Sequence, residues 1–413
     1  MKIYELLAGW MDNPEIIGHI FVENSRGKEI ISFSYTDEWL IKHPDFILDP
    51  DVFPMRGRQY IADGKSCFGF LSDTAPDRWG RKLIARRERI DAKKEHRSPR
   101  TLFESDYIFG VNDFGRTGGL RFRDTETGEF VSKRNILAAP PITELRRLEQ
   151  ASLNLEDSKD PDEEKWFKDL IEPGSSLGGA RPKANVLDEN GNIWIAKFPS
   201  RNDDRNVGAW EMLLHDLQKK CGINVPDAQK MDISDAGSIF LVKRFDRIGT
   251  KRVHFSSAMT MLSETDNSNN QMGYLDIAGV IESICLNSES DLHELWARMV
   301  FNICTSNTDD HLRNHGFLYK NDGWTLSPAY DVNPNPENER LSLLIGDDNI
   351  KDLNAALEIA NYFRYSTKEA KAKISFIQET IRNSWEKLAD FYHISRAEQK
   401  SMKTAFEKAY ANH

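Results

Sequence analysis

The sequence is poor in cysteine, and none of its cysteines stands in a CxxC pair. Zinc ribbons need closely spaced thiols, and disulfide frameworks need a dense set of them, so both are excluded. We expect four buried, reduced thiols: Cys67, Cys221, Cys285 and Cys304.

Long apolar runs and an excess of positive charge are also missing. No stretch reaches the roughly 18 apolar residues that a membrane helix needs, and the first residues lack a basic segment followed by a long apolar one. We therefore expect a soluble, cytoplasmic protein that makes no membrane contact. The formal net charge of -10 argues against broad nucleic-acid binding, so any contact with DNA has to be local or made through a partner.

What is present is the composition of a large globular protein. The chain has 413 residues, of which 39% are hydrophobic and 29% charged. This length exceeds the size at which one core stops growing, so two or three packed lobes are expected. An acidic stretch near residues 140–165 marks a boundary. We predict an N-terminal β-rich domain over 1–140, a small lobe over 141–247 and a helical large lobe over 248–413.

Local patterns predict the elements of the first part. Two strand-like segments flank Gly27, which suits a hairpin turn. From Asp73 to about Arg97 the apolar spacing predicts one long helix, with Asp73 or Thr74 as its N-cap. Ten Lys or Arg lie between Arg78 and the residue at position 100. They indicate either a solvated helix face, which is the favoured interpretation, or a surface for DNA or an acidic partner.

After the boundary, the expected order is a glycine-containing loop, a hairpin around "DENGN", a helix ending at Gly222 and a second hairpin around "DAG". Beyond about residue 256 we expect helices, apart from two short strands around "NDG" in "GFLYKNDGWTLSP". A strand-rich small lobe followed by an all-helical large lobe is therefore predicted.

The segment "SNTDDHLRNHGF", residues 306–317, concentrates polar groups. His311 and His315 have the spacing of a zinc pair on a helix, but a third ligand and the adjacent glutamate are missing, so zinc is disfavoured. Asp309 precedes Asn314 by five positions, which is the D-x-x-x-x-N interval of a kinase catalytic loop. This interval favours Asp309 as the base and leaves Asp310 as a supporting residue.

Three further residues follow the order of a bilobal kinase. Lys197 lies on a predicted strand, Glu211 lies on the next helix as its partner, and Asp331 follows a short strand after the loop. Each has an ordinary alternative: a strand-edge lysine, a surface glutamate and a turn former before Pro334. Their joint order favours the kinase interpretation.

With these residues the chain resembles the HipA family of bacterial serine/threonine kinase toxins. "TDDHLRNHGFLY" and "WTLSPAYDVNP" resemble its catalytic and magnesium-binding segments, and "SSLGGARPK" resembles its phosphate loop. "FLVKRFDR" is similar to its hinge, and "FGFLSDTAPDRWGRKLI" resembles the end of its N-terminal domain. The likeness runs from roughly residue 15 to 390 and implies an α+β, bilobal, protein-kinase-like fold.

The resemblance also implies roles. Asp309 is the base, Asn314 and Asp331 hold Mg²⁺, and Ser176 is autophosphorylated in self-inactivation, although Ser175 and Ser176 are alternatively ordinary loop serines. ATP contacts are implied for a larger set: Leu177, Gly178, Gly179, Ala180, Arg181, Lys183, Lys197, Lys243, Arg244, Phe245, His311 and Asn314.

Two motifs depart from better-known kinases. The phosphate loop has neither the Walker spacing nor G-x-G-x-x-G, although its glycines allow backbone N–H groups to approach phosphate. Thr308 stands before Asp309 where eukaryotic kinases have Arg, so activation through a phosphorylated loop is not expected.

We therefore expect an ATP- and Mg²⁺-dependent serine/threonine protein kinase, the toxin of a toxin–antitoxin pair. The family implies a helix-turn-helix antitoxin of the HipB type, DNA contact only through that antitoxin, and an aminoacyl-tRNA synthetase as a plausible target. The alternatives are a catalytically silent regulatory or co-repressor subunit and a kinase for a small molecule.

Overall fold

The computed structural model describes residues 1–132, 139–156, 170, 181–266 and 271–411. The chain divides into a first unit, residues 1–201 with 246–256, and a second unit, residues 202–245 with 257–413. The second segment of the first unit thus lies far from the rest of that unit in sequence. The division into 1–140, 141–247 and 248–413 stays a prediction.

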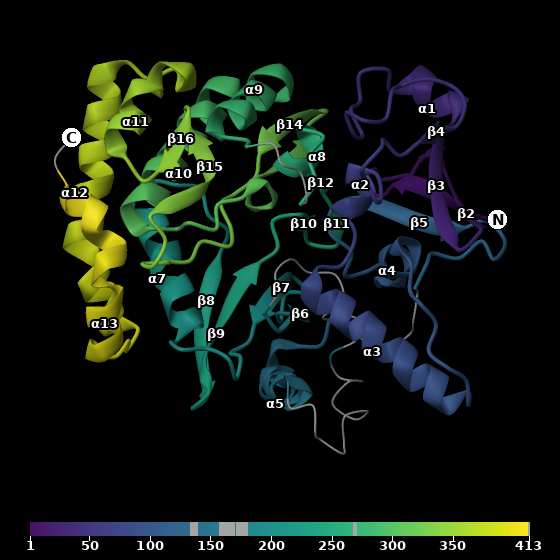
Figure 1. Cartoon of the computed structure of the whole chain (residues 1–413), viewed down its shortest axis with the longest axis horizontal. Coiled ribbons are helices and arrows are strands. Elements are labelled where there is room, and N and C mark those ends of the chain that lie inside the picture. Colours follow the sequence, from purple (N-terminus) through teal and green to yellow (C-terminus); the bar gives the residue numbers. More distant parts are fainter. Residues whose placement is uncertain (133–138, 157–169, 171–180, 267–270, 412–413) are drawn as a thin grey trace. The chain divides into compact units, whose positions relative to one another are not determined.

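A five-stranded antiparallel sheet begins the first unit (Figure 1). Its order is β4 (Gln59–Tyr60), β3 (Lys28–Tyr35), β2 (Ile16–Ser25), β1 (Lys2–Ala8) and β5 (Leu120–Asp124). The β2–β3 hairpin closes at Arg26 and Gly27, both with positive φ, as a two-residue turn requires. The predicted hairpin is confirmed.

Helices of the first unit follow the sheet: α1 (Asp37–Lys42), α2 (Gly69–Ser72), α3 (Arg78–Lys94), α4 (Glu104–Gly110) and α5 (Leu145–Glu156). The predicted start of the long helix at Asp73 or Thr74 is wrong. The α3 N-cap is Asp77, whose carboxylate accepts a hydrogen bond from the Gly80 amide at 2.8 Å. Pro76 precedes this cap, and the short α2 takes up the preceding apolar residues.

The hairpin predicted around "DENGN" is also present. Strand β6 (Lys183–Leu187) pairs antiparallel with β7 (Ile193–Lys197). Asp188 organises the turn because its carboxylate accepts hydrogen bonds from the Asn192 side chain at 2.8 Å and the Trp194 indole at 2.9 Å. These donors outweigh burial and lower the pKa of Asp188 to about 2.

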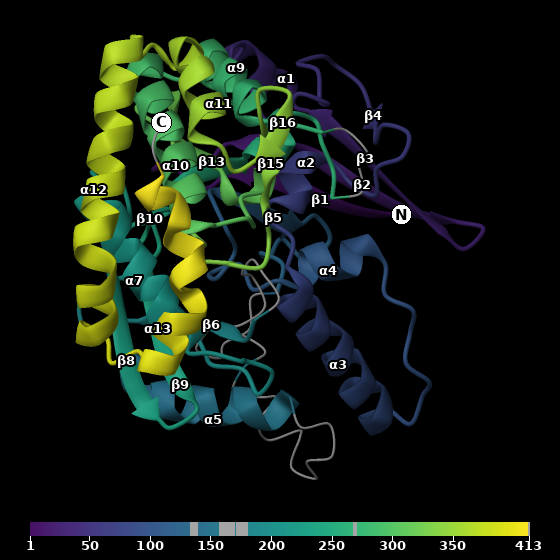
Figure 2. The ribbon, with the colours of Figure 1, turned by 60° about the vertical axis from the view of Figure 1, so that its left-hand side comes forward.

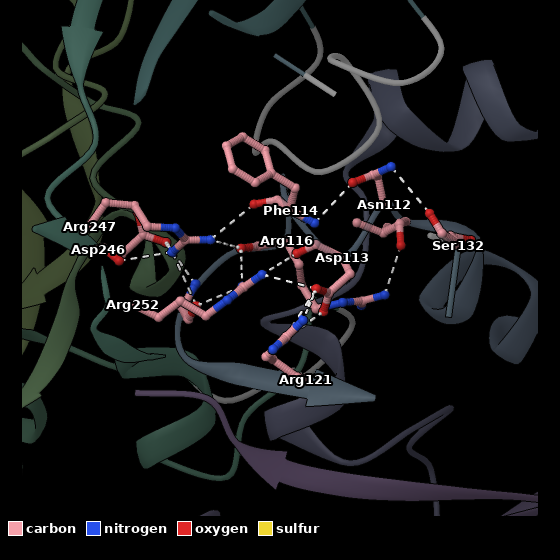
Figure 3. A network of polar contacts seen from close by, with 11 residues as sticks. Asn112, Asp113, Phe114, Arg116, Arg121, Ser132, Asp246, Arg247 and Arg252 are labelled. Atoms are coloured by element: carbon pink, nitrogen blue, oxygen red, sulfur yellow. Dashed lines mark hydrogen bonds and ion pairs between the residues drawn. The ribbon is translucent and has the colours of Figure 1, made fainter. Parts of the chain in front are cut away.

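A buried arginine ties residues 246–256 to the rest of the first unit (Figure 3). The Arg247 guanidinium donates to Asp246 Oδ2 at 2.8 Å and to the carbonyls of Arg116 at 2.6 Å and Gly118 at 3.2 Å. Asp246 Oδ2 in turn accepts from the Gly118 amide at 2.7 Å. The loop at residues 112–119 is thus held mainly through its backbone.

Two more arginines complete this network. Arg252 donates to the carbonyl and the carboxylate of Asp113, and Arg121 reaches the same carboxylate at 2.7 Å. Burial acts to raise the pKa of Asp113, but the two guanidinium groups hold it below its usual value. Arg116 has no exposed surface and donates to three backbone carbonyls, and burial lowers its pKa to about 9.

The second unit opens with the other predicted elements. Helix α7 (Val207–Lys220) buries Trp210, Leu213, Leu214 and Leu217 completely and is followed by Gly222 at positive φ. Strands β8 (Ala228–Ser234) and β9 (Gly237–Lys243) form the hairpin expected around "DAG". These predictions are confirmed.

Helices dominate the rest of this unit, as Figure 2 shows. They are α8 (Ala258–Met261), α9 (Tyr274–Ile284), α10 (Ser288–Thr305), α11 (Leu353–Glu358), α12 (Thr367–Phe391) and α13 (Arg396–Met402), with 3₁₀ turns at Ala360–Phe363 and Lys403–Tyr410. Helix α10 packs against α9 and α12, and Trp385 of α12 stacks on Phe406 at 4.6 Å.

Strands are more numerous after residue 256 than predicted. The expected pair is present as β13 (Gly316–Lys320) and β14 (Gly323–Leu326). A second hairpin, β15 (Arg340–Ile345) and β16 (Asp348–Ile350), occupies a segment for which we expected helix. Gly346 at positive φ makes its turn. The large lobe is therefore rich in helix but not all-helical.

The four thiols are free, as expected. Three of them are buried, and Cys285 is partly exposed.

We expect Arg247→Lys to loosen the 112–119 loop. Lysine keeps the charge but cannot donate to several oxygens at once, so buried carbonyls lose their donors. Amide hydrogen exchange at 112–119 and 246–256 should become about 100-fold faster, equivalent to about 3 kcal/mol. Arg56→Lys is the matched control, because the Arg56 side chain is 75% exposed and, among the described residues, pairs with Asp37 alone. Equal exchange rates in the two variants would show that Arg247 does not hold the 112–119 loop.

Candidate active site

The loop that carries Asp309 begins at the end of α10. Ser306 terminates the helix with a left-handed backbone, φ 52°. Its hydroxyl donates to the Ala405 carbonyl at 2.9 Å and accepts from the Lys351 ammonium at 2.9 Å. The first residue of the loop is therefore fixed by two distant segments of the same unit.

Asparagines hold the next turn of the loop. The Asn307 amide and side chain bind the Asn302 carbonyl at 3.0 Å and Asn302 Oδ1 at 3.1 Å. Asn307 Oδ1 accepts from the Asn333 amide at 3.2 Å. Since Asn333 lies two residues after Asp331, this bond brings the segment of Asp331 to the base of the loop.

Asp309 and Asp310 occupy opposite environments. The Asp309 side chain is 77% exposed, whereas Asp310 is 1% exposed. Asp310 accepts hydrogen bonds from the Tyr274 hydroxyl at 2.5 Å and the Ser342 amide at 2.7 Å. Burial raises the pKa of Asp310 to about 6 despite these donors. Asp310 thus anchors the loop, and Asp309 is the carboxylate that a substrate can reach.

Asn314 closes the loop over Asp309. A 3₁₀ turn, Leu312–Asn314, brings Asn314 Nδ2 to the Asp309 carbonyl at 2.6 Å. Because the side-chain nitrogen of Asn314 makes this bond, the side-chain oxygen of Asn314 points away from the Asp309 carbonyl. His311 Nε2 lies 3.7 Å from Asp309 Oδ1. The structure therefore brings three of the predicted site residues together.

Asp331 follows β14 and has a left-handed backbone, φ 58°. Aspartate tolerates this conformation better than most residues, but it still costs energy and is common at functional sites. The preceding Tyr330 donates from its hydroxyl to the Arg313 carbonyl at 2.6 Å, and its ring lies 5.4 Å from that of Phe245. Tyr330 thus joins the predicted hinge to the residue before Asn314.

A small pocket opens beside this loop in the second unit. Polar groups predominate in its lining: Gln218, Arg298, Asn302, Asn307, Asp310, Asn314, His315, Ala329, Tyr330 and Val332. His315 is buried, and burial lowers its pKa to about 3, so it is neutral at physiological pH. His315 is therefore an uncharged part of the pocket lining.

The other residues predicted in the second unit lie on elements that precede the loop. Glu211 is on α7 and is 4% exposed. Lys243 ends β9 and approaches Asp227 at 3.8 Å, while Arg244 is buried.

Residues predicted to contact phosphate fall partly in the first unit. Lys197 and Lys183 face each other across β6 and β7. The Lys183 ammonium is buried and lies 3.2 Å from Asp77 Oδ2, so it is paired with the cap of α3. Arg181 donates to the Phe198 carbonyl at 3.2 Å. Leu177, Gly178, Gly179, Ala180, Ser175 and Ser176 lie outside the described residues.

Sequence analysis missed the partners that orient the loop. Tyr274 and Ser342 donate to Asp310, Asn302 donates to Tyr274, and Tyr330 donates to the carbonyl of the residue before Asn314. Asn302 offered a signal, because it is a polar residue in the apolar run "MVFNIC". Tyr274 and Ser342 lie 36 and 32 residues from Asp310 and carry no local pattern that links them to it.

None of the helices in the described part of the chain is long and apolar enough to cross a membrane. Among the same residues no three His, Cys, Asp or Glu side chains converge on one point that suits a metal ion.

Known families match both parts of the chain. The family described as HipA-like C-terminal domain matches residues 175–391, and the family described as HipA N-terminal domain matches residues 10–98. The first match covers more than half of the chain.

Individual proteins are also similar. "Putative kinase Y4dM" of Sinorhizobium fredii is 27% identical over 154 residues, which are 34% of this chain and 37% of that protein. The match thus spans little more than a third of this curated relative. The solved structure of Shewanella oneidensis MR-1 HipA, in a complex with HipB and operator DNA, gives a TM-score of 0.66 at 15% identity and covers 98% of this chain and 96% of that one. The predicted α+β, HipA-like fold is confirmed.

We expect Tyr274→Phe to destabilise the loop in a pH-dependent way. The variant removes a donor from the Asp310 carboxylate, so the pKa of Asp310 should rise above about 6. Loss of the Tyr274 hydroxyl destabilises the ionised form of Asp310 more than the protonated form. The free energy of unfolding should therefore fall by about 1–3 kcal/mol at pH 8 and by less at pH 5.

The control is Tyr365→Phe, which removes a hydroxyl that makes no recorded hydrogen bond with any described residue and should change stability by less than about 0.5 kcal/mol. Denaturant titrations at both pH values provide the measurement. A loss that is the same at pH 5 and pH 8 would show that Tyr274 does not act through the Asp310 charge.

Proposed function

The chain belongs to the HipA family, and from that premise we propose that it is an ATP- and Mg²⁺-dependent serine/threonine protein kinase. The observation that carries the proposal is the loop after α10. There an exposed Asp309 and an Asn314 five positions later are joined by a 2.6 Å hydrogen bond. This arrangement leaves a carboxylate accessible beside an amide oxygen, as phosphoryl transfer requires.

Asp309 is proposed as the group that accepts the proton of the substrate hydroxyl. Its 77% exposed side chain can meet a hydroxyl without prior movement of the loop. Asp310 anchors the loop, and His311 Nε2 lies 3.7 Å from Asp309 Oδ1. Accurate positioning is the main contribution a protein makes to this reaction.

Asn314 and Asp331 are proposed to hold Mg²⁺. The fit rests on donor chemistry, because Mg²⁺ prefers carboxylate and amide oxygens, and the Asn314 nitrogen is already bound to the Asp309 carbonyl. When bound, Mg²⁺ neutralises charge on the phosphate oxygens. Asn314 is oriented by its own hydrogen bond, and the bond between Asn307 and Asn333 ties the segment of Asp331 to the loop.

Nucleotide contacts are proposed for the residues that the resemblance to the family implies. Phe245 contributes an aromatic face toward the adenine, and Lys197 supplies charge to the phosphates with Glu211 as its partner. The remaining proposed ATP contacts are Leu177, Gly178, Gly179, Ala180, Arg181, Lys183, Lys243, Arg244 and His311. In this role the Lys183 ammonium would contact phosphate while it stays next to the Asp77 carboxylate.

The biological setting is proposed from the family. The Shewanella HipA structure contains HipB and operator DNA, so we propose that this chain is a toxin whose partner is a helix-turn-helix antitoxin. An aminoacyl-tRNA synthetase or a similar translation protein is the proposed target, and Ser176 is the proposed site of self-inactivation. The setting is proposed to be cytoplasmic.

We expect Asp309→Ala to abolish phosphoryl transfer while ATP binding persists. Loss of a general base lowers kcat by about 10²- to 10⁴-fold, and the KM for ATP should change little. Transfer of the γ-phosphate from labelled ATP, with mapping of the phosphopeptide that contains Ser176, provides the measurement. Asp347→Ala is the matched control, since Asp347 is an exposed turn aspartate of the same unit.

Three results would contradict this function. A wild-type chain that does not bind ATP is not a kinase. Binding without transfer, equal in wild type and Asp309→Ala, indicates a silent regulatory subunit. Label on a metabolite, with none on protein, indicates a small-molecule kinase.

A further inference from the structure

Helix α3 of the first unit (Figure 2) carries a row of cations along one face. Arg78, Lys82, Arg89 and Lys93 are separated by four, seven and four residues, which places them on one face of the helix. All four are exposed. We call these residues the α3 ridge; it runs about 22 Å along the helix axis.

The acidic residues of α3 do not neutralise this ridge. Glu88 is buried on another side of the helix and accepts hydrogen bonds from Arg97 and from the Arg100 amide. These donors lower the pKa of Glu88 to about 2, so it stays ionised and committed to them. Among the residues that the structure describes, none forms an ion pair or hydrogen bond with a ridge side chain.

Other basic residues on and near α3, unlike those of the ridge, bind groups of the described chain. Arg81 pairs with Glu104, and Arg86 donates to the Leu155 carbonyl at 2.8 Å. Arg97 and Arg100 both bind Glu88. These four cations thus bind other residues of the fold, whereas the ridge cations form no ion pair or hydrogen bond within the described chain. Four long, like-charged side chains held together on a rigid helix repel one another unless an anion lies over them.

The chemistry of the ridge restricts the anion. Its members are only Lys and Arg, with no aromatic side chain on which single-stranded bases stack. Asn and Gln, which read adenine edges, are also absent from α3. A straight row of point charges without a pocket suits a continuous polyanion, and a duplex presents a phosphate every 3.4 Å along each strand.

We propose that the α3 ridge binds the phosphate backbone of double-stranded DNA directly and without sequence preference. Because the net charge of the chain is -10, DNA can bind only where positive charge is concentrated locally, and the α3 ridge is such a surface. This contact differs from the indirect contact through an antitoxin given above. It does not depend on the proposed kinase activity.

The test uses the full chain and a duplex of mixed sequence. A ridge variant replaces Arg78, Lys82, Arg89 and Lys93 by Ala. The matched control replaces four exposed lysines of the second unit, Lys368, Lys371, Lys387 and Lys400, and so removes the same total charge. A third variant exchanges Arg and Lys at the four ridge positions and keeps every charge.

Fluorescence anisotropy against salt gives the readout. Four phosphate contacts contribute about 3 to 4 to the slope of log K against log salt, or about 100-fold in affinity between about 50 and 200 mM. In the ridge variant the slope of log K against log salt should be smaller in magnitude by about 3 to 4. The variant should also bind the duplex at least about tenfold more weakly at low salt. The control and the exchange variant should bind as the wild type does.

Several results would overturn the proposal. They are absence of duplex binding by the wild type, equal losses in the ridge and control variants, and tighter binding of single-stranded than of duplex DNA. Binding of polyglutamate with the same dependence on the ridge would identify an acidic protein as the partner instead. ATP-dependent phosphorylation, measured in the same variants, should be unchanged and separates this proposal from the kinase function.

Discussion

The candidate site depends on one buried carboxylate. Asp310 lies in an interior where an ionised group is tolerated only with hydrogen-bond donors, and Tyr274 and Ser342 provide them. Because Asp310 is held inward, its neighbour Asp309 faces solvent, and Asn314 folds back onto the Asp309 carbonyl. A loop of mostly irregular backbone thereby gains a fixed shape from these hydrogen bonds.

Much of this arrangement could be predicted because it is local. Asp309 and Asn314 lie within one stretch of six residues. The hairpins that turn at Gly27 and at Asp188 each follow from a short turn sequence. Amphipathic spacing identified the buried side of α7. Such features need no knowledge of distant segments, so a single sequence contains them.

What could not be predicted comes from distant residues. Tyr274 and Ser342 are partners of Asp310 only because α9 and β15 pack beside the loop. The start of α3 was misplaced because Asp73, Thr74 and Asp77 are all good caps, and the choice among them depends on the helix α2 that precedes them. Strands β15 and β16 were missed because their apolar run suits a helix equally well, and a Gly turn decides between the two.

The arginine network of the first unit has a consequence for the order of events during synthesis. Arg247 and Arg252 complete the loop at 112–119, yet they are made long after it. The ribosome adds roughly 5–20 residues per second, so the 133 residues from position 119 to position 252 take about 7 to 27 s. Throughout that interval the loop carbonyls that Arg247 and Arg252 bind lack these donors, while α7 and the β8–β9 hairpin are made. The N-terminal unit is thus finished by a segment that follows part of the second unit, and it cannot mature independently on the ribosome.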